Sequence, residues 1–377
     1  MSNWILRVMD SIHNMLAFSV PVDQKIDFLS VMYASPDPRE DVEGARDVNA
    51  AFIDDFRSRV WLTYRRDFTP LLDKDSIATS ITSDAGWGCS IRVTQMLLAQ
   101  SLVYIDLGRD WRLSSATEEE RILYHRILEL FRDTPDSPYS IHKIVATGHA
   151  LFCKKPSEWF GPTTGARAIT HLINQHATSL TETAGKSSVR GIAFDSGDIY
   201  RQEVEEIFFN NPDTSAILVL LTHRLGLDYL NLTRYKRTIQ GLFTHPFFQG
   251  LSSGEARVSA YYFFAASDDN LYYLDPHTVQ PPFLSEAIGV VPPQPKPLKM
   301  RWSRLNPSLT MGFVVKNISE WNSLCDFLKD LDGELFDIQQ VPRVFSDEDF
   351  RIRTPEPRNS TGEPSPEDDE DEMVIIS

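Results

Sequence analysis

The chain contains 377 residues, of which 42% are hydrophobic and 24% charged, with 22 Phe, 12 Tyr and 7 Trp. This composition supplies enough apolar side chains for one large domain or two ordinary ones, and it excludes a wholly disordered chain. The 53 acidic and 37 basic residues give a formal net charge of −16. Because phosphate binding requires clustered cations and the sequence has no stripe of Lys and Arg, we expect no nucleic-acid partner.

Half of the negative charge lies at the C-terminal end of the chain. Residues 346–377 contain eleven acidic and three basic side chains, a net charge of −8, and residues 1–345 carry the remaining −8. Proline, charge and scarce apolar residues predict disorder over 346–377. We therefore expect a folded domain over residues 1–345 and a disordered acidic tail after it.

The three cysteines, Cys89, Cys153 and Cys325, are an odd number and lie far apart in the sequence. They do not build a disulfide framework, and such usage is typical of a reducing compartment. We therefore expect a cytoplasmic protein.

The first twenty residues do not have the pattern of a targeting signal. Arg7, Asp10 and His13 interrupt the segment MSNWILRVMDSIHNMLAFSV, so that no continuous apolar stretch precedes a cleavage site. An amphipathic helix that covers the core fits this segment better. Elsewhere the longest apolar run, Ala216–Leu221, is far shorter than the roughly 20 residues of a membrane helix, and we expect no transmembrane segment.

Hydrophobic periodicity predicts helices in the earlier part of the chain and strands in the later part. The expected helices are Val48–Trp61, a buried helix that begins at Cys89, Glu118–Phe131 and Glu203–Phe209. A Ser/Thr/Gly-rich loop is expected at Thr178–Ser188. The expected strands are Ala216–Leu221, Ala260–Ala266, Leu271–Leu274 and Met311–Val315. Helices followed by sheet indicate an α+β fold.

Cys89 has an unusual context, because Gly86, Trp87 and Gly88 precede it and a helix begins at it or just after it. Glycines permit close backbone approach to a ligand. A helix N-terminus offers unbonded N–H groups and a partial positive charge, and both favour a thiolate, the form that attacks carbonyls. This segment alone fits an inert buried cysteine equally well.

The triplet Asp275-Pro276-His277 could supply a base for Cys89. If the strand from Leu271 continues through it, residues i and i+2 project to one face, so that Asp275 holds one ring nitrogen of His277 and the other faces Cys89. That is the logic of a nucleophile, a base and an orienting carboxylate. A simple Asp-Pro turn with an exposed histidine is the alternative.

Other histidines favour structural roles over a metal site. His149 and Cys153 are four residues apart, but no second pair at zinc-binding spacing follows and no HExxH motif occurs. His171 and His176 fit ordinary core or surface positions. Gly-rich phosphate loops are also absent from the sequence. We therefore expect neither a metal nor an organic cofactor.

The segment TSDAGWGCSIRVTQMLLAQSLVY, residues 82–104, closely resembles the active-site segment of the autophagins. These are cysteine proteases that process the GABARAP-type ubiquitin-like modifiers of autophagy. Further matches follow the family's order and cover most of residues 58–315. They are SRVWLTYRRDF (Ser58–Phe68), LGRDW (Leu107–Trp111), YSIHKI (Tyr139–Ile144), EWFGPTTGA (Glu158–Ala166), LVLLTHRLGLDYLN (Leu218–Asn231) and LYYLDPHTVQP (Leu271–Pro281).

The resemblance implies a role for each matching residue. Cys89 corresponds to the nucleophile, His277 to the general base and Asp275 to the residue that orients it. Tyr64 corresponds to a tyrosine near the oxyanion site, where its hydroxyl would act with the Cys89 backbone N–H. Trp159 corresponds to a tryptophan that covers the catalytic cysteine together with a mobile loop. Without the family, Tyr64 and Trp159 would be taken for core aromatic residues.

The resemblance also implies a fold, a mobile loop and a C-terminal docking motif. The expected fold is a papain-like catalytic domain over residues 1–345 with a helical insertion at roughly 105–210. The mobile loop is expected within Gly250–Val258, which is rich in Ser and Gly. The family's C-terminal docking motif places an aromatic residue after acidic ones, whereas this chain has Met373 there, with Ile376 at the aliphatic position. The tail is therefore expected either to dock on the modifier or only to aid solubility.

The sequence departs from the family near Cys89. Val93 stands at a position that is commonly a second cysteine in the family, so that redox control at that position is in doubt.

The reactions implied by the resemblance are cleavage of the modifier after a glycine and its removal from phosphatidylethanolamine, with membrane contact only through the lipidated substrate. Two alternatives stay open: an inactive autophagin-like scaffold that binds the modifier, and a broader papain-like or deubiquitinating protease.

Overall fold

The computed structural model describes residues 19–21, 24–37, 39, 41–72, 77–184, 188–255, 259–284 and 293–341. The chain divides into two compact units, Met1–Val341 and Pro342–Ser377, and the second lies outside the described residues. The predicted acidic tail and the N-terminal helix expected before Ser19 lie outside them as well. The described residues all belong to the first unit.

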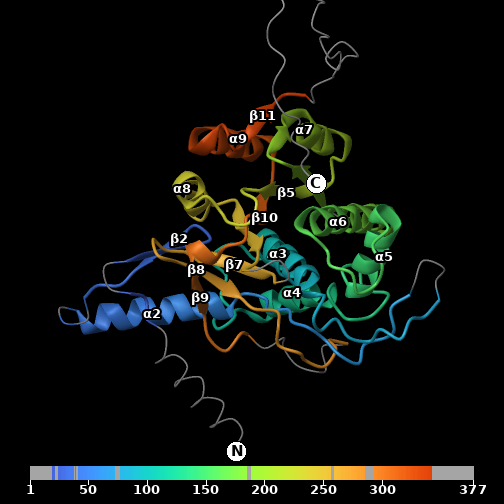
Figure 1. The fold of residues 1–377 in the computed structure, drawn as a ribbon, viewed down its shortest axis with the longest axis horizontal. Helices are drawn as coiled ribbons and strands as arrows, with labels where there is room; N and C mark the ends of the chain where they lie inside the picture. Colours follow the sequence, from blue (N-terminus) through green and yellow to red (C-terminus); the bar gives the residue numbers. More distant parts are fainter. Residues whose placement is uncertain are drawn as a thin grey trace, which may run out of the picture. The chain divides into compact units, whose positions relative to one another are not determined.

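The described part of the first unit combines helices with one large sheet (Figure 1). Its helices are α2 (Val42–Arg57), α3 (Cys89–Asp106), α4 (Glu118–Glu129), α5 (Ile141–Phe152), α6 (Pro162–Ala184), α7 (Arg201–Asn210), α8 (Leu232–Leu242) and α9 (Ile318–Asp332). Its strands are β1 (Lys25–Phe28), β2 (Val31–Ala34), β3 (Ser188–Asp195), β4 (Asp198–Tyr200), β5 (Thr214–Arg224), β6 (Phe248–Ser253), β7 (Tyr261–Ala266), β8 (Asn270–Leu274), β9 (Leu298–Arg301), β10 (Ser308–Val315) and β11 (Asp337–Gln339).

The main sheet has the strand order β2-β1-β7-β6-β10-β5-β3, and β8 and β9 extend it from β7. Neighbouring strands are antiparallel, with the exception of β3, which runs parallel to β5. The described strands β4 and β11 form a separate parallel pair. The sheet therefore joins the N-terminal hairpin to strands more than 200 residues later, through the pairing of Phe28 with Ala265.

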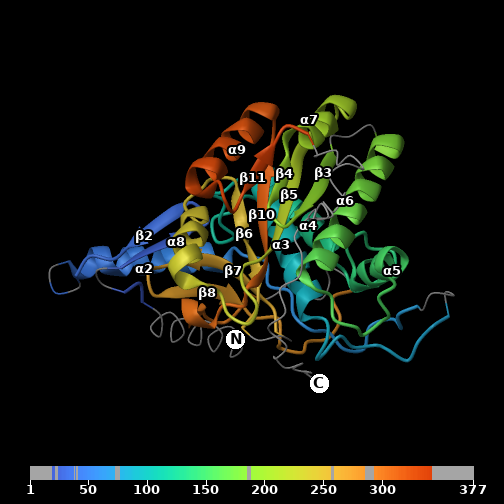
Figure 2. The ribbon, with the colours of Figure 1, turned by 45° about the horizontal axis from the view of Figure 1, so that its top comes forward.

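Helices cover both faces of this sheet (Figure 2). Side chains alternate between the two faces of a strand. At Gly312 of β10, a side chain would meet Leu97 of α3 at 2.7 Å, so this face receives α3 closely. The next residue, Phe313, packs on Phe248 with ring centroids 5.3 Å apart, and Phe248 contacts Phe243 at the end of α8. Helix α3 is thus enclosed between the sheet and its neighbouring helices, and Cys89 through Val103 are all buried.

The structure confirms most of the expected elements and corrects three of them. The expected loop at Thr178–Ser188 is wrong, because α6 continues to Ala184, with the Thr181 hydroxyl bonded to the Ala177 carbonyl. The helix-first order is wrong as well, because β1 and β2 precede α2. Finally, residues 105–210 are not wholly helical, since they contain β3, a strand of the main sheet. Among the described helices, none is long and apolar enough to span a membrane.

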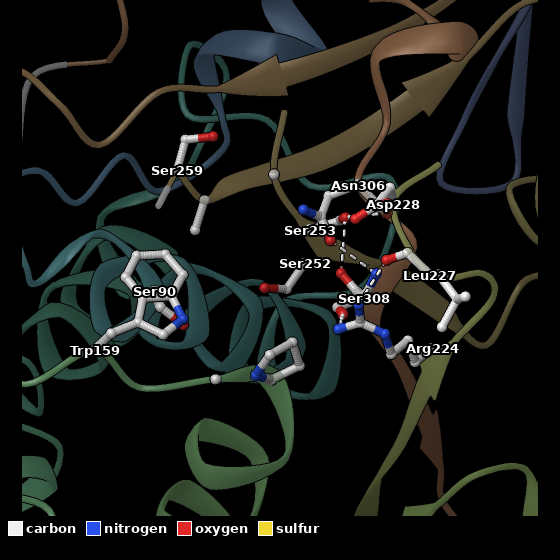
Figure 3. A pocket seen from close by; sticks show the side chains of 14 residues that line it. Ser90, Trp159, Arg224, Leu227, Asp228, Ser252, Ser253, Ser259, Asn306 and Ser308 are labelled. Carbon is white, nitrogen blue, oxygen red and sulfur yellow. Dashed lines mark hydrogen bonds between the residues drawn. The ribbon is translucent and has the colours of Figure 1, made fainter. Parts of the chain in front are cut away.

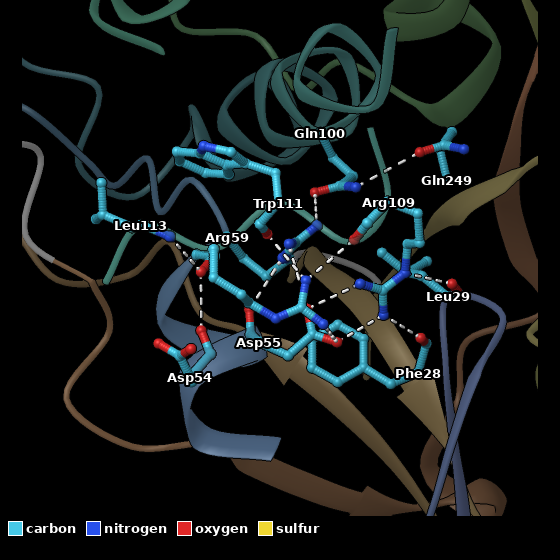
Figure 4. A network of polar contacts seen from close by, with 12 residues as sticks. Phe28, Leu29, Asp54, Asp55, Arg59, Gln100, Arg109, Trp111, Leu113 and Gln249 are labelled. Carbon is cyan, nitrogen blue, oxygen red and sulfur yellow. Dashed lines mark hydrogen bonds and ion pairs between the residues drawn. The ribbon is translucent and has the colours of Figure 1, made fainter. Parts of the chain in front are cut away.

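A buried carboxylate fixes the N-terminal hairpin to the helices (Figure 4). The Asp55 side chain is fully buried and accepts a hydrogen bond from the Tyr33 hydroxyl at 2.8 Å. Three arginines pair with it: Arg109 at 2.6 Å, and Arg59 and Arg112 at 3.2 Å. Burial alone would raise the pKa of Asp55, but these guanidinium groups outweigh burial and lower it. The charged carboxylate therefore ties α2 to β2 and to the chain after α3.

We predict that Asp55→Asn lowers the free energy of unfolding by about 3–5 kcal/mol, because it leaves buried arginines without their counter-charge. The folded-state pKa of Asp55 lies below its ordinary value of 3.8. Its stabilisation is thus present above that value and disappears as the pH falls through the folded-state pKa. Denaturant unfolding from pH 7 to pH 3 should show the difference between wild type and variant shrinking with acid.

The matched control is Asp37→Asn, which removes a surface ion pair with Arg39. It should unfold like the wild type, since exposed pairs contribute little. Equal effects of the two substitutions, or a difference that does not change with pH, would contradict this account of Asp55.

Candidate active site

Cys89 is the first residue of α3 and its side chain is fully buried. The turn before it is held by Asp84, whose carbonyl oxygen accepts the Gly88 N–H at 2.9 Å. A side chain at Gly88 would meet the Asp84 side chain at 2.5 Å, so glycine is required there. The predicted helix start at Cys89 is confirmed, so Cys89 stands in the first turn of α3, where the helix dipole places a partial positive charge.

The contact between Asp275 and His277 is present, but the reason given for it from the sequence is wrong. Strand β8 ends at Leu274, and Pro276 and His277 form a turn. Within this turn the Asp275 Oδ1 accepts two hydrogen bonds from His277, one from the backbone N–H at 2.9 Å and one from Nδ1 at 2.5 Å. The expected alternative of a turn is thus correct for the backbone. The His277 side chain is nevertheless only 31% exposed.

Two further groups fix the backbone of Asp275. Its N–H donates to Gln294 Oε1 at 2.7 Å, and its carbonyl oxygen accepts the Trp61 indole N–H at 2.7 Å. Gln294 also donates to the carbonyl of Tyr273 at 3.2 Å. These bonds hold the turn in one orientation relative to β8. The sequence contains no local sign of them, because they join residues up to 214 positions apart.

The electrostatics of this turn favour a charged histidine. Burial lowers the pKa of His277, but hydrogen bonds with Asp275 and Cys89 outweigh it and raise the pKa to about 9. Burial raises the pKa of Asp275, while the two hydrogen bonds from His277 outweigh burial and lower it. His277 is therefore an imidazolium at neutral pH, paired with a carboxylate on one side and with the Cys89 sulfur on the other. A cation beside a cysteine favours the nucleophilic thiolate form.

Tyr64 contacts both Cys89 and His277. Its backbone N–H donates to the Pro276 carbonyl at 2.8 Å, and its ring lies 5.4 Å from the His277 ring at an interplanar angle of 87°. Burial and a hydrogen bond with Cys89 raise the pKa of the Tyr64 hydroxyl, and a bond with the Gly86 backbone opposes them. The hydroxyl is thus protonated at neutral pH and lies next to the sulfur.

A buried ionic network lies beneath these residues. Arg92, fully buried in α3, pairs with Asp84 at 2.8 Å and with Asp133 at 2.7 Å. Burial lowers the pKa of Arg92, but the two carboxylates outweigh burial and raise it, so Arg92 is charged. Asp84 also accepts the Arg65 backbone N–H at 2.6 Å, and Asp133 accepts the Phe283 N–H at 2.8 Å. The network thus joins α3 to the segments that carry Tyr64 and His277.

A cavity of about 490 Å³ is lined by Ser90, the residue after Cys89 (Figure 3). Ser90, the residue after Cys89, and Trp159 lie together at one side of it, and Arg224 and Asn306 lie at the other. Trp159 lies between α5 and α6 and packs partly against the core. The structure thus places Ser90, the neighbour of Cys89, and Trp159 on the wall of one cavity.

The mobile loop predicted at Gly250–Val258 is wrong over its first four residues, which belong to the buried strand β6. Gly254 and Glu255 follow the strand, and residues 256–258 lie outside the described residues. Ser252, Ser253 and Gly254 line the cavity. The segment therefore borders the cavity through the end of β6 and the residue that follows it.

His149 and His176, two of the histidines considered from the sequence, each have a hydrogen-bond partner within the protein. The His149 Nδ1 bonds to the Lys154 carbonyl at 3.1 Å, and His176 Nδ1 bonds to the Tyr139 hydroxyl at 2.9 Å. Cys153 is exposed at the end of α5. Within the described ranges, no three His, Cys, Asp or Glu side chains are grouped as metal ligands. Met373 and Ile376 of the expected docking motif lie outside the described residues.

Residues 49–327 match the peptidase C54 catalytic domain, and this range contains all five candidate residues. The chain is similar to the "probable cysteine protease atg4" of Botryotinia fuckeliana, at 32% identity over 76% of this chain and 68% of the relative. It is similar to "cysteine protease ATG4" of Pyricularia oryzae at 34% identity, over 75% of this chain and 62% of the relative. With the "probable cysteine protease atg4" of Aspergillus oryzae it shares 34% identity, over 72% of this chain and 70% of the relative.

These matches confirm the resemblance to the autophagins and the papain-like α+β fold expected from it. The chain belongs to the peptidase C54 family, the Atg4-type cysteine proteases.

Proposed function

We propose that this chain cleaves the C-terminus of a ubiquitin-like modifier of the GABARAP type after a glycine, and that it removes the same modifier from phosphatidylethanolamine. The observation that carries the proposal is the arrangement of Cys89, His277 and Asp275 beside the cavity that Trp159 lines, in a chain of the C54 family. We propose the cytoplasm as its location, with membrane contact only through the lipidated substrate.

In the proposed reaction, the Cys89 thiolate attacks the carbonyl carbon of the glycine and forms a tetrahedral intermediate. The Cys89 backbone N–H and the Tyr64 hydroxyl donate hydrogen bonds to the oxyanion. His277, already protonated, gives its proton to the leaving amine, and a thioester remains on Cys89. Water then attacks the thioester while His277 accepts its proton, the bond between the carbonyl carbon and the Cys89 sulfur breaks, and the modifier leaves with a glycine carboxylate as the Cys89 thiolate is restored. Asp275 holds His277 through both steps.

The same chemistry serves both leaving groups, because a peptide nitrogen and the nitrogen of phosphatidylethanolamine are both amide nitrogens acylated by glycine. The proposed preference for glycine is that Trp159, which lines the cavity together with Ser90, covers a narrow slot that excludes a side chain at the scissile residue. The tail residues Met373 and Ile376 are proposed as a second contact with the modifier. No step of this mechanism uses a metal or an organic cofactor.

Two alternatives predict different behaviour. An inactive scaffold would bind the modifier without cutting it. The paired Asp275, His277 and Cys89 disfavour that function, since a histidine whose pKa is raised by such contacts is typical of catalytic sites. A broader deubiquitinating protease would cut ubiquitin fusions as fast as modifier fusions, and a parallel assay of both fusions separates the two specificities.

We predict that Cys89→Ala abolishes cleavage of a tagged modifier precursor while binding stays close to that of the wild type, because only the nucleophilic sulfur is lost. Gel analysis of the precursor measures cleavage, and calorimetric titration measures binding. Cys153→Ala is the matched control, since this exposed cysteine lies at the end of α5, and it should retain full activity. Cleavage of the precursor by the Cys89→Ala variant would refute the role of Cys89 as the nucleophile.

Asp275→Asn should lower kcat by about 10²- to 10⁴-fold in a folded protein, because the amide holds the wrong tautomer of His277. Loss of the carboxylate also lets burial lower the pKa of His277, so the alkaline limb of the pH–rate profile should move below its wild-type position near pH 9. Steady-state kinetics between pH 6 and 10 measure both effects. Unchanged kcat with an unchanged limb would mean that another group orients the ring.

A third prediction concerns the folded part of the modifier. Leu227 and Tyr229, in the loop between β5 and α8, are each 81% exposed, and Leu227 lines the cavity. Leu227→Asp should raise KM about tenfold with little change in kcat, because it places a charge at a contact that the substrate must desolvate. Phe209→Asp is the matched control: Phe209 is 85% exposed on α7, which contributes no residue to the cavity. Equal KM values for the two variants would refute this contact.

A further inference from the structure

The His277 ring lies between two tyrosine rings. Tyr64 and Tyr261 each have their ring centroid 5.4 Å from that of His277, at interplanar angles of 87° and 69°. The two tyrosines come from separate parts of the chain, since Tyr64 precedes α3 and Tyr261 begins β7. Such tilted and edge-on aromatic contacts are favourable and depend on orientation. His277 is therefore contacted by rings as well as by Asp275 and Cys89.

The sheet fixes the position of Tyr261. In β7, Tyr261 pairs with Ser253 of β6, and its neighbour Tyr262 pairs with Leu274, the last residue of β8. The Tyr261 ring packs on Tyr273 at 4.5 Å, which itself packs on Phe263 at 5.7 Å. We name these three residues, Tyr261, Phe263 and Tyr273, the aromatic wall.

Within the aromatic wall, Tyr261 is the residue that contacts His277. Burial raises the pKa of Tyr261, and the charges of Asp275 and Cys89 raise it further, while a hydrogen bond with Ser259 opposes them. The Tyr261 hydroxyl thus bonds to Ser259, which lines the cavity, and its ring contacts His277. Tyr261 therefore interacts electrostatically with Asp275 and Cys89, and through its ring with His277.

Rotation about χ2 of a histidine has a broad energy profile, so the single bond from Nδ1 to Asp275 does not by itself fix the plane of the ring. We propose that Tyr261 is a positioning residue for His277: together with Tyr64 it fixes the imidazole plane, so that Nδ1 stays on Asp275 and Nε2 stays directed at the Cys89 sulfur. This inference rests on the proposed function, because it assigns Tyr261 a part in the reaction of Cys89 and His277.

A consequence concerns the titration of His277. The titratable groups that face it are Asp275 from its own turn, Cys89 from α3, Tyr64 and Tyr261. A looser ring forms weaker hydrogen bonds with Asp275 and Cys89, the two groups that keep His277 protonated. The alkaline limb of the pH–rate profile should then move to lower pH.

The test uses the full chain and a tagged modifier precursor. Tyr261→Met and Tyr261→Val both remove the ring, the first with a flexible apolar side chain and the second with one that suits a strand. A folded variant should have a kcat about tenfold lower, an unchanged KM and an alkaline limb at lower pH. Tyr261→Phe keeps the ring and should restore both kcat and the limb. Tyr235→Leu, a tyrosine change on α8, should behave as the wild type.

The outcomes separate this inference from the proposed function. Wild-type protein that does not cut any modifier precursor, or active Cys89→Ala, overturns the proposed function and the inference with it. An active wild type whose folded Met or Val variant keeps its kcat and pH limb overturns the inference alone. If circular dichroism shows both ring-free variants unfolded, Tyr261 is a core residue and the positioning role is refuted as well.

Discussion

The geometry of the site depends on the burial of Arg92. A guanidinium without water is tolerated only when counter-charges surround it, and Asp84 and Asp133 do so at 2.8 and 2.7 Å. These two carboxylates in turn accept backbone N–H groups from Arg65 and Phe283. Removal of either carboxylate would leave the buried Arg92 charge partly unpaired. Helix α3 and the chain segments that carry Tyr64 and His277 therefore have little freedom to separate.

The ion pairs of Arg92 fix the reacting groups through their neighbours in the sequence. Arg92 lies one helical turn after Cys89 in α3, Arg65 follows Tyr64, and Phe283 lies six residues after His277. The large sheet supplies the other fixed side, since β8 leads into Asp275 and β7 begins with Tyr261. The candidate site therefore lies where loops meet rigid elements: Cys89 begins α3, while Tyr64 and His277 lie in loops that the ionic network and the sheet hold.

The sequence was sufficient for features whose cause is local. Two glycines before Cys89 predict a tight turn into a helix, and α3 begins there. The two strands around residue 270 were predicted because they flank a short hairpin connection, Ser267–Asn270, in the sequence, and they pair as β7 and β8. Strand alternation predicted the pairing of Asp275 with His277, but a turn makes it. The prediction of the contact was still correct, because residues two positions apart can meet in either geometry.

Features caused by distant partners could not be predicted in this way. Arg92 looks like any polar residue of a helix until Asp133, 41 positions later, lies against it. Tyr64 and Trp159 were singled out only by resemblance, and Tyr261 was not singled out at all. Composition also misled in two places, because the threonines of α6 bond to their own helix and the small residues of β6 pack inside the sheet.

The most direct measurement identifies the residue to which the modifier becomes covalently attached. The modifier is prepared with an electrophile in place of its scissile glycine carbonyl, incubated with the full chain at neutral pH, and the adduct is mapped by mass spectrometry. The account predicts one modifier per chain, attached to Cys89, and none from the equivalent ubiquitin reagent. Attachment to Cys153 or Cys325, or equal attachment of ubiquitin, would contradict it.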